Sequence, residues 1–253
     1  MDACRITTGK TEGGDVFMKR TGTVFLGVIF FLCAVSNGDA SRSRLFERRL
    51  QKNITQTYFV QTPRGYNPDQ TYSLLIAVHS EKESSRDAVG HWGALADRDN
   101  YILVCPSFNV GFETLQNKED LWLMHILLEL QGDFPYDKDS VYMVGFSGGG
   151  DCVHRLAFKR PNIVQAVCVL AAEHYDDPPT LMRNRQVKFF VGVGENDTFI
   201  KDNRVTKAKK FFNILKVTGY DVSFKIYPET GRNLSEAMRD DTMMFFNTIR
   251  KNR

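Results

Sequence analysis

A serine stands at the centre of the segment GFSGGG, which follows the apolar residues 141–144 and precedes the helix-compatible stretch DCVHRLAFKR. A serine between a strand and a helix requires a sharp turn, and glycines two positions to either side, Gly145 and Gly149, let the backbone pass without collision. The hydroxyl would then project beside a helix N-terminus, which stabilises developing negative charge. The pattern predicts a nucleophile at Ser147, and a glycine-rich turn without chemistry is the alternative.

The elements that must position this serine alternate along the chain. Continuous apolar runs predict strands at 55–62, 73–78, 101–105, 141–144, 164–170 and 187–193, and alternating residues predict a last strand, closer to the sheet edge, at 222–226. Helical spacing appears at 121–128, 205–215 and 238–249. This order predicts an α/β fold, a mostly parallel sheet with helices on both faces, in one domain over 41–253. Chemistry in such sheets gathers in the loops after the strands.

Composition restricts the class of protein further. The chain has 253 residues, of which 42% are hydrophobic and 25% charged, so it can form a sizeable core and is not disordered, collagen-like or a coiled coil. Its net charge is +3, and neither sign runs in long blocks. No nucleic acid partner is therefore expected.

The N-terminus carries a separate apolar run at 23–35, TVFLGVIFFLCAV, preceded by basic residues and followed by small and polar ones. This is the pattern of a secretory signal peptide. We expect residues 1–40 to be an extension and signal, with Met18 as a possible true start and a cut after Ala40 or, alternatively, after Ser36. The mature chain would be secreted or periplasmic. If the run stays uncleaved, it would anchor the chain in a membrane.

Three cysteines lie beyond the predicted signal, Cys105, Cys152 and Cys168, each in an apolar stretch. None has a spacing that holds zinc, so we expect buried thiols and no metal site. The oxidising environment of an exported protein would also permit one disulfide between two of these cysteines. The fragment at 192–194 lacks the third glycine of a dinucleotide fingerprint, and no cofactor is predicted.

The chain resembles the α/β-hydrolases, and among them the compact secreted esterases grouped with polyhydroxyalkanoate depolymerases, feruloyl esterases and dienelactone-hydrolase-like proteins. Beside GFSGGG, the resemblance rests on LLIAVH at 74–79, WGALADRDNYILVCP at 92–106, DSVYMVGFSGG at 139–149, Arg160-Pro161 and GENDT at 194–198. It implies an α/β-hydrolase fold and serine-dependent hydrolysis of small or polymeric carboxylic esters. The short segment between 170 and 187 leaves no room for a large cap.

The resemblance also assigns roles to individual positions. Ser147 matches the nucleophile, Gly148 the residue whose backbone N–H holds the oxyanion, and Asp197 the acid of the triad. The second oxyanion donor usually follows a His-Gly pair, but this chain has serine in place of that glycine. The N–H of Ser80 or of Glu81 would have to serve, next to a carboxylate that disfavours an oxyanion.

The base of such a triad is missing. The resemblance predicts a Gly-His pair in the loop after 222–228, where the chain has Arg232 instead. Arginine stays protonated and cannot accept the serine proton. All five histidines precede Asp197: His79, His91, His125, His154 and His174.

His174 is the best replacement among these histidines, because it follows the strand 164–170 on the same rim as Ser147. A surface histidine is the alternative. We expect His79 to be structural at a strand end, His125 and His154 to lie on helices, and His91 to precede a helix.

Two functions remain open. One is a serine ester hydrolase with Ser147, Asp197 and an unusual base such as His174. The other is a catalytically impaired, hydrolase-like protein that binds a ligand or partner, with Arg232 pairing with Asp197 or holding an anionic ligand.

Overall fold

In a computed structural model of the chain, the described residues are 42–49, 57–107, 119–179, 187–199 and 202–252. The predicted signal and its possible cleavage sites lie outside these ranges. Within the ranges, no helix combines the length and apolar character needed to cross a membrane. The export signal stays a prediction.

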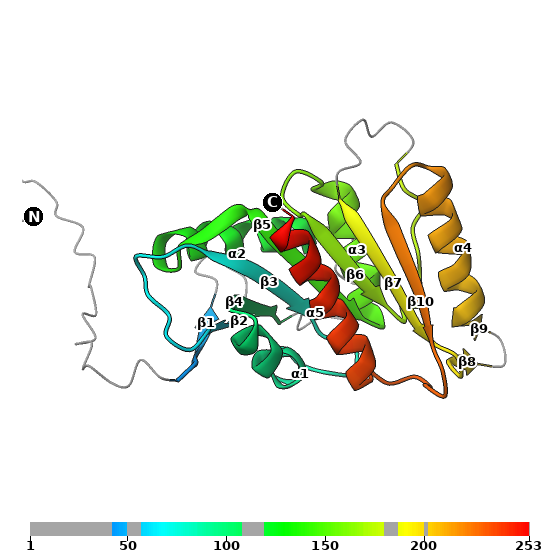
Figure 1. The fold of residues 1–253 in the computed structure, drawn as a ribbon, viewed down its shortest axis with the longest axis horizontal. Coiled ribbons are helices and arrows are strands. Elements are labelled where there is room, and N and C mark those ends of the chain that lie inside the picture. Colours follow the sequence, from blue (N-terminus) through cyan, green and yellow to red (C-terminus); the bar gives the residue numbers. More distant parts are fainter. Residues whose placement is uncertain (1–41, 50–56, 108–118, 180–186, 200–201, 253) are drawn as a thin grey trace, which may run out of the picture. The chain divides into compact units, whose positions relative to one another are not determined.

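Eight strands form one sheet in the order β1-β2-β4-β3-β5-β6-β7-β10 (Figure 1). They are β1 (Arg44–Arg49), β2 (Thr57–Thr62), β3 (Tyr72–Val78), β4 (Tyr101–Pro106), β5 (Tyr136–Phe146), β6 (Ala166–Leu170), β7 (Lys188–Gly194) and β10 (Val222–Tyr227). All strands from β4 to β10 in this order pair in parallel, whereas β2 is antiparallel to both of its neighbours. Two short strands, β8 (Thr198–Phe199) and β9 (Asp202–Asn203), pair separately. The predicted mostly parallel sheet, with its last strand at the edge, is confirmed.

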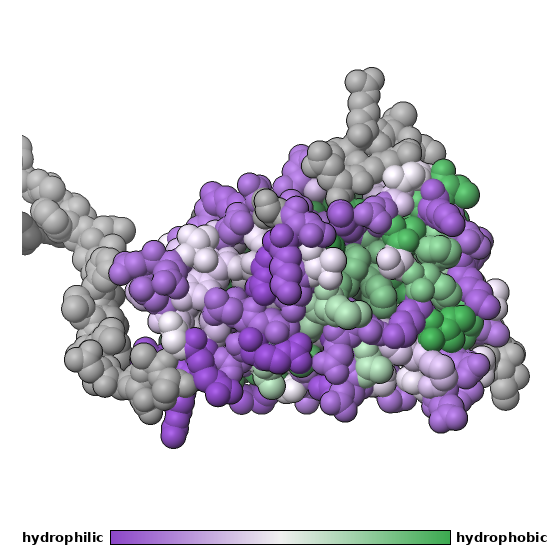
Figure 2. All heavy atoms as spheres, viewed as in Figure 1, coloured by the Kyte–Doolittle hydropathy of each residue, from purple (hydrophilic) through white to green (hydrophobic). Residues whose placement is uncertain are grey.

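Helices cover both faces of the sheet, and each face has its own apolar core. The helices α1 (Ser85–Arg98) and α5 (Glu236–Lys251) pack in one core, while α2 (Glu119–Asp133), α3 (Gly148–Lys159) and α4 (Arg204–Val217) pack in the other. Neighbouring side chains of a strand point to opposite faces, so Leu74 and Leu75 of β3 belong to different cores. Figure 2 shows mostly hydrophilic side chains over α1 and α5, and hydrophobic ones gathered over β7 and β10.

Some elements differ from the sequence prediction. The edge strand β1 has no counterpart in it, and a helix was expected only after His91. The placement of His91 before a helix was wrong, because α1 already begins after a capping box formed by Ser84 and Asp87. The predicted burial of the three cysteines is confirmed, and each thiol is free: Cys105, Cys152 and Cys168.

Candidate active site

Ser147 occupies a strained turn between β5 and α3. Its backbone has φ 54° and ψ −124°, a conformation that is unusual for any residue except glycine. The turn is fixed by its neighbours: the Ser147 N–H donates to the carbonyl of Leu170 at 2.9 Å, and the Gly150 N–H donates to the Ser147 carbonyl at 2.8 Å. The structure thus has the sharp strand-to-helix turn that the sequence predicts.

The flanking glycines are required by close backbone approaches. A Cβ atom on Gly145 would lie 2.1 Å from the Gly149 carbonyl oxygen, and one on Gly149 would lie 2.4 Å from the carbonyl oxygen of Val78 and 2.6 Å from that of His79. Neither site has space for a side chain. The same approach brings the end of β3 against the first turn of α3.

A cavity of about 550 Å³ opens beside Ser147. It is formed by the segments that follow β3, β5, β6 and β10, together with α1. Its lining residues are Ser80, Glu81, Lys82, Glu83, His91, Phe146, Ser147, Glu173, Arg232, Asn233 and Leu234. Of the residues predicted from sequence, the structure therefore brings Ser147, Ser80, Glu81 and Arg232 together around one cavity.

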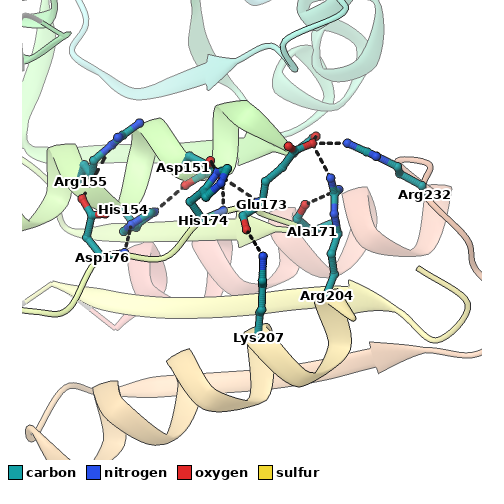
Figure 3. A network of polar contacts seen from close by, with 12 residues as sticks. Asp151, His154, Arg155, Ala171, Glu173, His174, Asp176, Arg204, Lys207 and Arg232 are labelled. Carbon is teal, nitrogen blue, oxygen red and sulfur yellow. Dashed lines mark hydrogen bonds and ion pairs between the residues drawn. The ribbon is translucent and has the colours of Figure 1, made fainter. Parts of the chain in front are cut away.

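The Ser147 hydroxyl meets a carboxylate. Its Oγ donates a hydrogen bond to Glu173 Oε1 at 3.1 Å, and no other side-chain partner of this hydroxyl is found in the described part of the chain. The same oxygen of Glu173 accepts from the guanidinium groups of Arg204 and Arg232 (Figure 3). Burial alone would raise the pKa of Glu173, but Arg204, Ser147 and Arg232 together hold that pKa below its usual value. Glu173 thus accepts the Ser147 hydrogen bond with a carboxylate whose ionised form is favoured.

Asp197 meets the site at Arg204. Asp197 is 1% exposed, and its Oδ2 lies 3.6 Å from Nη1 of Arg204, which is itself buried. Burial raises the pKa of Asp197, and the nearby charges of Arg204 and Arg232 only partly offset this effect. The resulting chain of contacts runs Ser147–Glu173–Arg204–Asp197, with arginine next to the acid where an imidazole was expected.

His174 and His91 contact carboxylates other than Glu173. His174 is 72% exposed at its side chain, and its Nδ1 lies 3.0 Å from Asp151 Oδ2. It lines a separate cavity of about 390 Å³. His91 does line the Ser147 cavity, but its Nε2 lies 3.0 Å from Glu83 Oε1. Among the described contacts, none between His174 and Ser147 supports a role of His174 as the base.

The predicted oxyanion donors differ in availability. Gly148 is the first residue of α3, so its N–H has no acceptor within the helix. Ser80 is already engaged, because its N–H and its hydroxyl both donate to Glu83 Oε2, at 3.3 Å and 2.8 Å. Glu81 is exposed at the rim of the cavity. To stabilise an oxyanion, the Ser80 N–H would have to break its hydrogen bond to the Glu83 carboxylate and donate to the substrate oxygen instead.

Two residues of this site were missed by sequence reasoning. Glu173 directly precedes His174, so sequence reasoning pointed to this loop, but the side chain that contacts Ser147 belongs to the neighbouring residue. Arg204 begins α4 without any motif that would have marked it. Across the described ranges, no three His, Cys, Asp or Glu side chains come together as metal ligands.

A parallel sheet with helices on both faces and a serine at a strained turn after a central strand defines an α/β-hydrolase. Solved structures agree in fold. A ferulic acid esterase covers 82% of this chain and 99% of its own, at 16% identity and a TM-score of 0.63. The ferulic acid esterase AmCE1/Fae1A from Anaeromyces mucronatus covers 84% and 92%, at 12% identity and a TM-score of 0.68. S-formylglutathione hydrolase from Staphylococcus aureus covers 83% and 97%, at 13% identity and a TM-score of 0.63.

Sequence comparison gives the family. The sequence model of the dienelactone hydrolase family matches residues 109–241, more than half of the chain, and the chain belongs to this family. A curated relative, the bifunctional acetylxylan esterase/xylanase XynS20E of Neocallimastix patriciarum, is 27% identical over 96 residues. This match spans 36% of the chain and only 14% of the relative. The predicted resemblance is confirmed.

Proposed function

We propose that this chain is a serine ester hydrolase in which Ser147 attacks the acyl carbonyl and Glu173 accepts the serine proton. The observation that carries the proposal is the 3.1 Å hydrogen bond from Ser147 Oγ to Glu173, made inside a cavity and on a strained turn. Glu173 replaces His174 in this proposal, because His174 contacts Asp151 and not the nucleophile.

The reaction would proceed in two halves. Ser147 Oγ bonds to the carbonyl carbon as its proton moves to Glu173, and the oxyanion that forms is held by the N–H of Gly148. Collapse breaks the ester C–O bond, and the leaving alkoxide takes the proton from Glu173. Water then attacks the acyl-serine, giving a proton to Glu173 that returns to Ser147 Oγ as the carboxylic acid leaves.

Such an enzyme would be slow beside one with a histidine base. A glutamate is already a weak base at neutral pH, and the lowered pKa of Glu173 makes it weaker still. An imidazole, with an ordinary pKa of about 6.5, is well matched to general base catalysis at neutral pH. Esters with good leaving groups need the least help with proton transfer. Acetyl and feruloyl esters are the first substrates to try, because relatives of this chain are named acetylxylan esterase and ferulic acid esterase.

A specific observation favours a second candidate, a protein that binds an ester or a related ligand without efficient turnover. Two guanidinium groups, from Arg204 and Arg232, contact the same carboxylate oxygen that faces Ser147. This arrangement stabilises the ionised carboxylate and weakens it as a base.

A fluorophosphonate probe and 4-nitrophenyl acetate separate the two candidates. We expect one covalent adduct per chain, located on the Ser147 peptide by mass spectrometry and absent from Ser147→Ala, together with steady-state release of 4-nitrophenol. An adduct without turnover would favour the binding protein. A parent chain that forms no adduct at Ser147 would contradict the hydrolase.

Arg232→Leu should make Glu173 a stronger base. Removing one of its two cationic partners raises the pKa of Glu173, so we expect fluorophosphonate labelling at pH 7 to become about two- to five-fold faster. The acid limb of the pH–rate profile should move to higher pH. Arg64→Leu is the matched control, because Arg64 pairs with Asp97 at 2.6 Å on an exposed part of the chain. An equal change in both variants would contradict the prediction.

A further inference from the structure

We propose that Asp151 and His154, one turn apart on α3, are positioning residues that hold the segment after β6 and thereby place Glu173 against Ser147. The inference rests on the proposed function of Glu173. Both side chains are buried and polar, and neither lines the cavity beside Ser147. Neither contacts a reacting atom in the reaction described above.

Asp151 fixes the backbone of Glu173 from the side of the nucleophile helix. Its side chain is 9% exposed, and its Oδ1 accepts the N–H of Glu173 at 2.7 Å and that of His174 at 3.2 Å. Its other oxygen meets the ring of His174 at 3.0 Å. A buried carboxylate that accepts two consecutive backbone N–H groups strongly restricts the path of the chain there.

His154 makes a second link between the same helix and the same segment. It is fully buried, with Nδ1 2.9 Å from the Gly150 carbonyl oxygen and Nε2 3.0 Å from the backbone nitrogen of Asp176. Because the Asp176 N–H can only donate, Nε2 must accept, and the proton of a neutral ring lies on Nδ1. Burial lowers the pKa of His154 to about 4, so this neutral tautomer persists at neutral pH.

The opposite side of the segment is held by α4. Lys207 Nζ donates to the Glu173 carbonyl at 3.2 Å, and Arg204 Nη1 donates to the Ala171 carbonyl at 3.1 Å. Ala171 has a φ of 46°, which is strained for alanine. Figure 3 shows this segment between the two helices, with Glu173 pointing toward the two arginines. These hydrogen bonds from α3 and α4 fix the position of the segment. They thereby also fix the position from which the Glu173 side chain extends.

His154 also links the segment that carries Glu173 to the turn that carries Ser147. The Gly150 carbonyl that His154 contacts is on the residue whose N–H closes the Ser147 turn. Small displacements of a catalytic group reduce rates strongly, by as much as about 100-fold for 1 Å. Loosening the segment at Asp176 should therefore slow proton transfer at Glu173 more than it weakens substrate binding, because most of the cavity lining lies on other segments.

His154→Phe tests the proposal while keeping an aromatic ring among Phe158, Tyr175 and Phe211, which surround His154. We expect faster hydrogen–deuterium exchange of the amides at 173–176, a kcat about 10- to 100-fold lower, and a KM within about two-fold of the parent. His154→Gln, which can again offer an acceptor to the Asp176 N–H, should recover part of both losses. His125→Phe is the control, because His125 is exposed on α2.

The exchange measurement stands apart from catalysis. Unchanged exchange at 173–176 in His154→Phe would overturn the proposal whether or not the parent turns over an ester. Faster exchange with an unchanged kcat would also overturn it, since His154 would then be merely structural. If the parent forms no adduct at Ser147, the hydrolase proposal fails by itself, and faster exchange in His154→Phe but not in His125→Phe would still support the positioning of Glu173.

Discussion

Glu173→Gln should lower kcat for 4-nitrophenyl acetate by about 1,000-fold, within the range expected for loss of a general base. Glutamine keeps the size of the side chain and can still accept a hydrogen bond from Ser147, but its amide cannot take up the proton. The steady-state rate of 4-nitrophenol release measures the effect. The melting temperature is recorded alongside, because the variant leaves the buried Arg204 beside a neutral group.

Glu47→Gln is the control for this variant. Glu47 is an exposed carboxylate on the edge strand β1, and its replacement makes the same change in net charge. We expect its kcat to equal that of the parent. A Glu173→Gln variant that is folded and retains the parent rate would contradict the role of Glu173.

The pH dependence distinguishes the two possible bases. Catalysis needs ionised Glu173, and because Arg204, Ser147 and Arg232 hold its pKa below the usual value of a glutamate, activity should stay nearly constant as the pH falls through the range in which an imidazole titrates. It should fall only as the pH drops through the pKa of Glu173. A histidine base would instead lose activity near its ordinary pKa of about 6.5. An inflection near 6.5 that disappears in His174→Ala would restore His174 as the base.

Gly149→Ala should lower the free energy of unfolding by about 3 kcal/mol and abolish labelling of Ser147. The added methyl group would lie 2.4 Å and 2.6 Å from two backbone carbonyl oxygens at the end of β3, at Val78 and His79. Backbone cannot move aside as a flexible side chain can, so β3 and α3 must separate and the Ser147 turn must change. Urea denaturation gives the stability, and fluorophosphonate labelling reports on the turn.

Gly90→Ala is the matched control. A Cβ atom on Gly90 would have no heavy atom within 4 Å, and the residue lies inside α1. Alanine is the better helix former, so this variant should gain about 0.5–1 kcal/mol in stability and label like the parent. Destabilisation of similar size in both variants would show that the close approach at Gly149 is not its cause.

The sequence was informative where local patterns determine structure. Strands buried on both faces, such as β3 and β6, leave continuous apolar runs, whereas β1 at the sheet edge carries arginines and no such run. The Ser147 turn was predictable because its glycines lie within two positions of Ser147 in the chain. The start of α1 was placed too late, after His91, although the capping residues Ser84 and Asp87 are visible in the sequence.

The polar partners of Ser147 were less accessible to prediction. Glu173 is 26 residues from Ser147, and Arg204 is 31 residues from Glu173, so no spacing rule connects them. In the loop after β6, Glu173 points to Ser147 and its neighbour His174 to Asp151. Sequence identifies the loop, but only the backbone path determines which of two adjacent side chains faces the cavity.

The contact between Arg204 and Asp197 has a consequence for any attempt to build a histidine base into this site. Such an enzyme would need more than a single substitution at position 232, because the carboxylate that should orient the new imidazole already has a cationic neighbour on α4. Histidine at 232 would compete with Arg204 for Asp197, and Glu173 would still hold the serine hydroxyl. A histidine-dependent site therefore requires coordinated substitutions whose separate effects are not additive, so no single step along the way is expected to give an efficient enzyme.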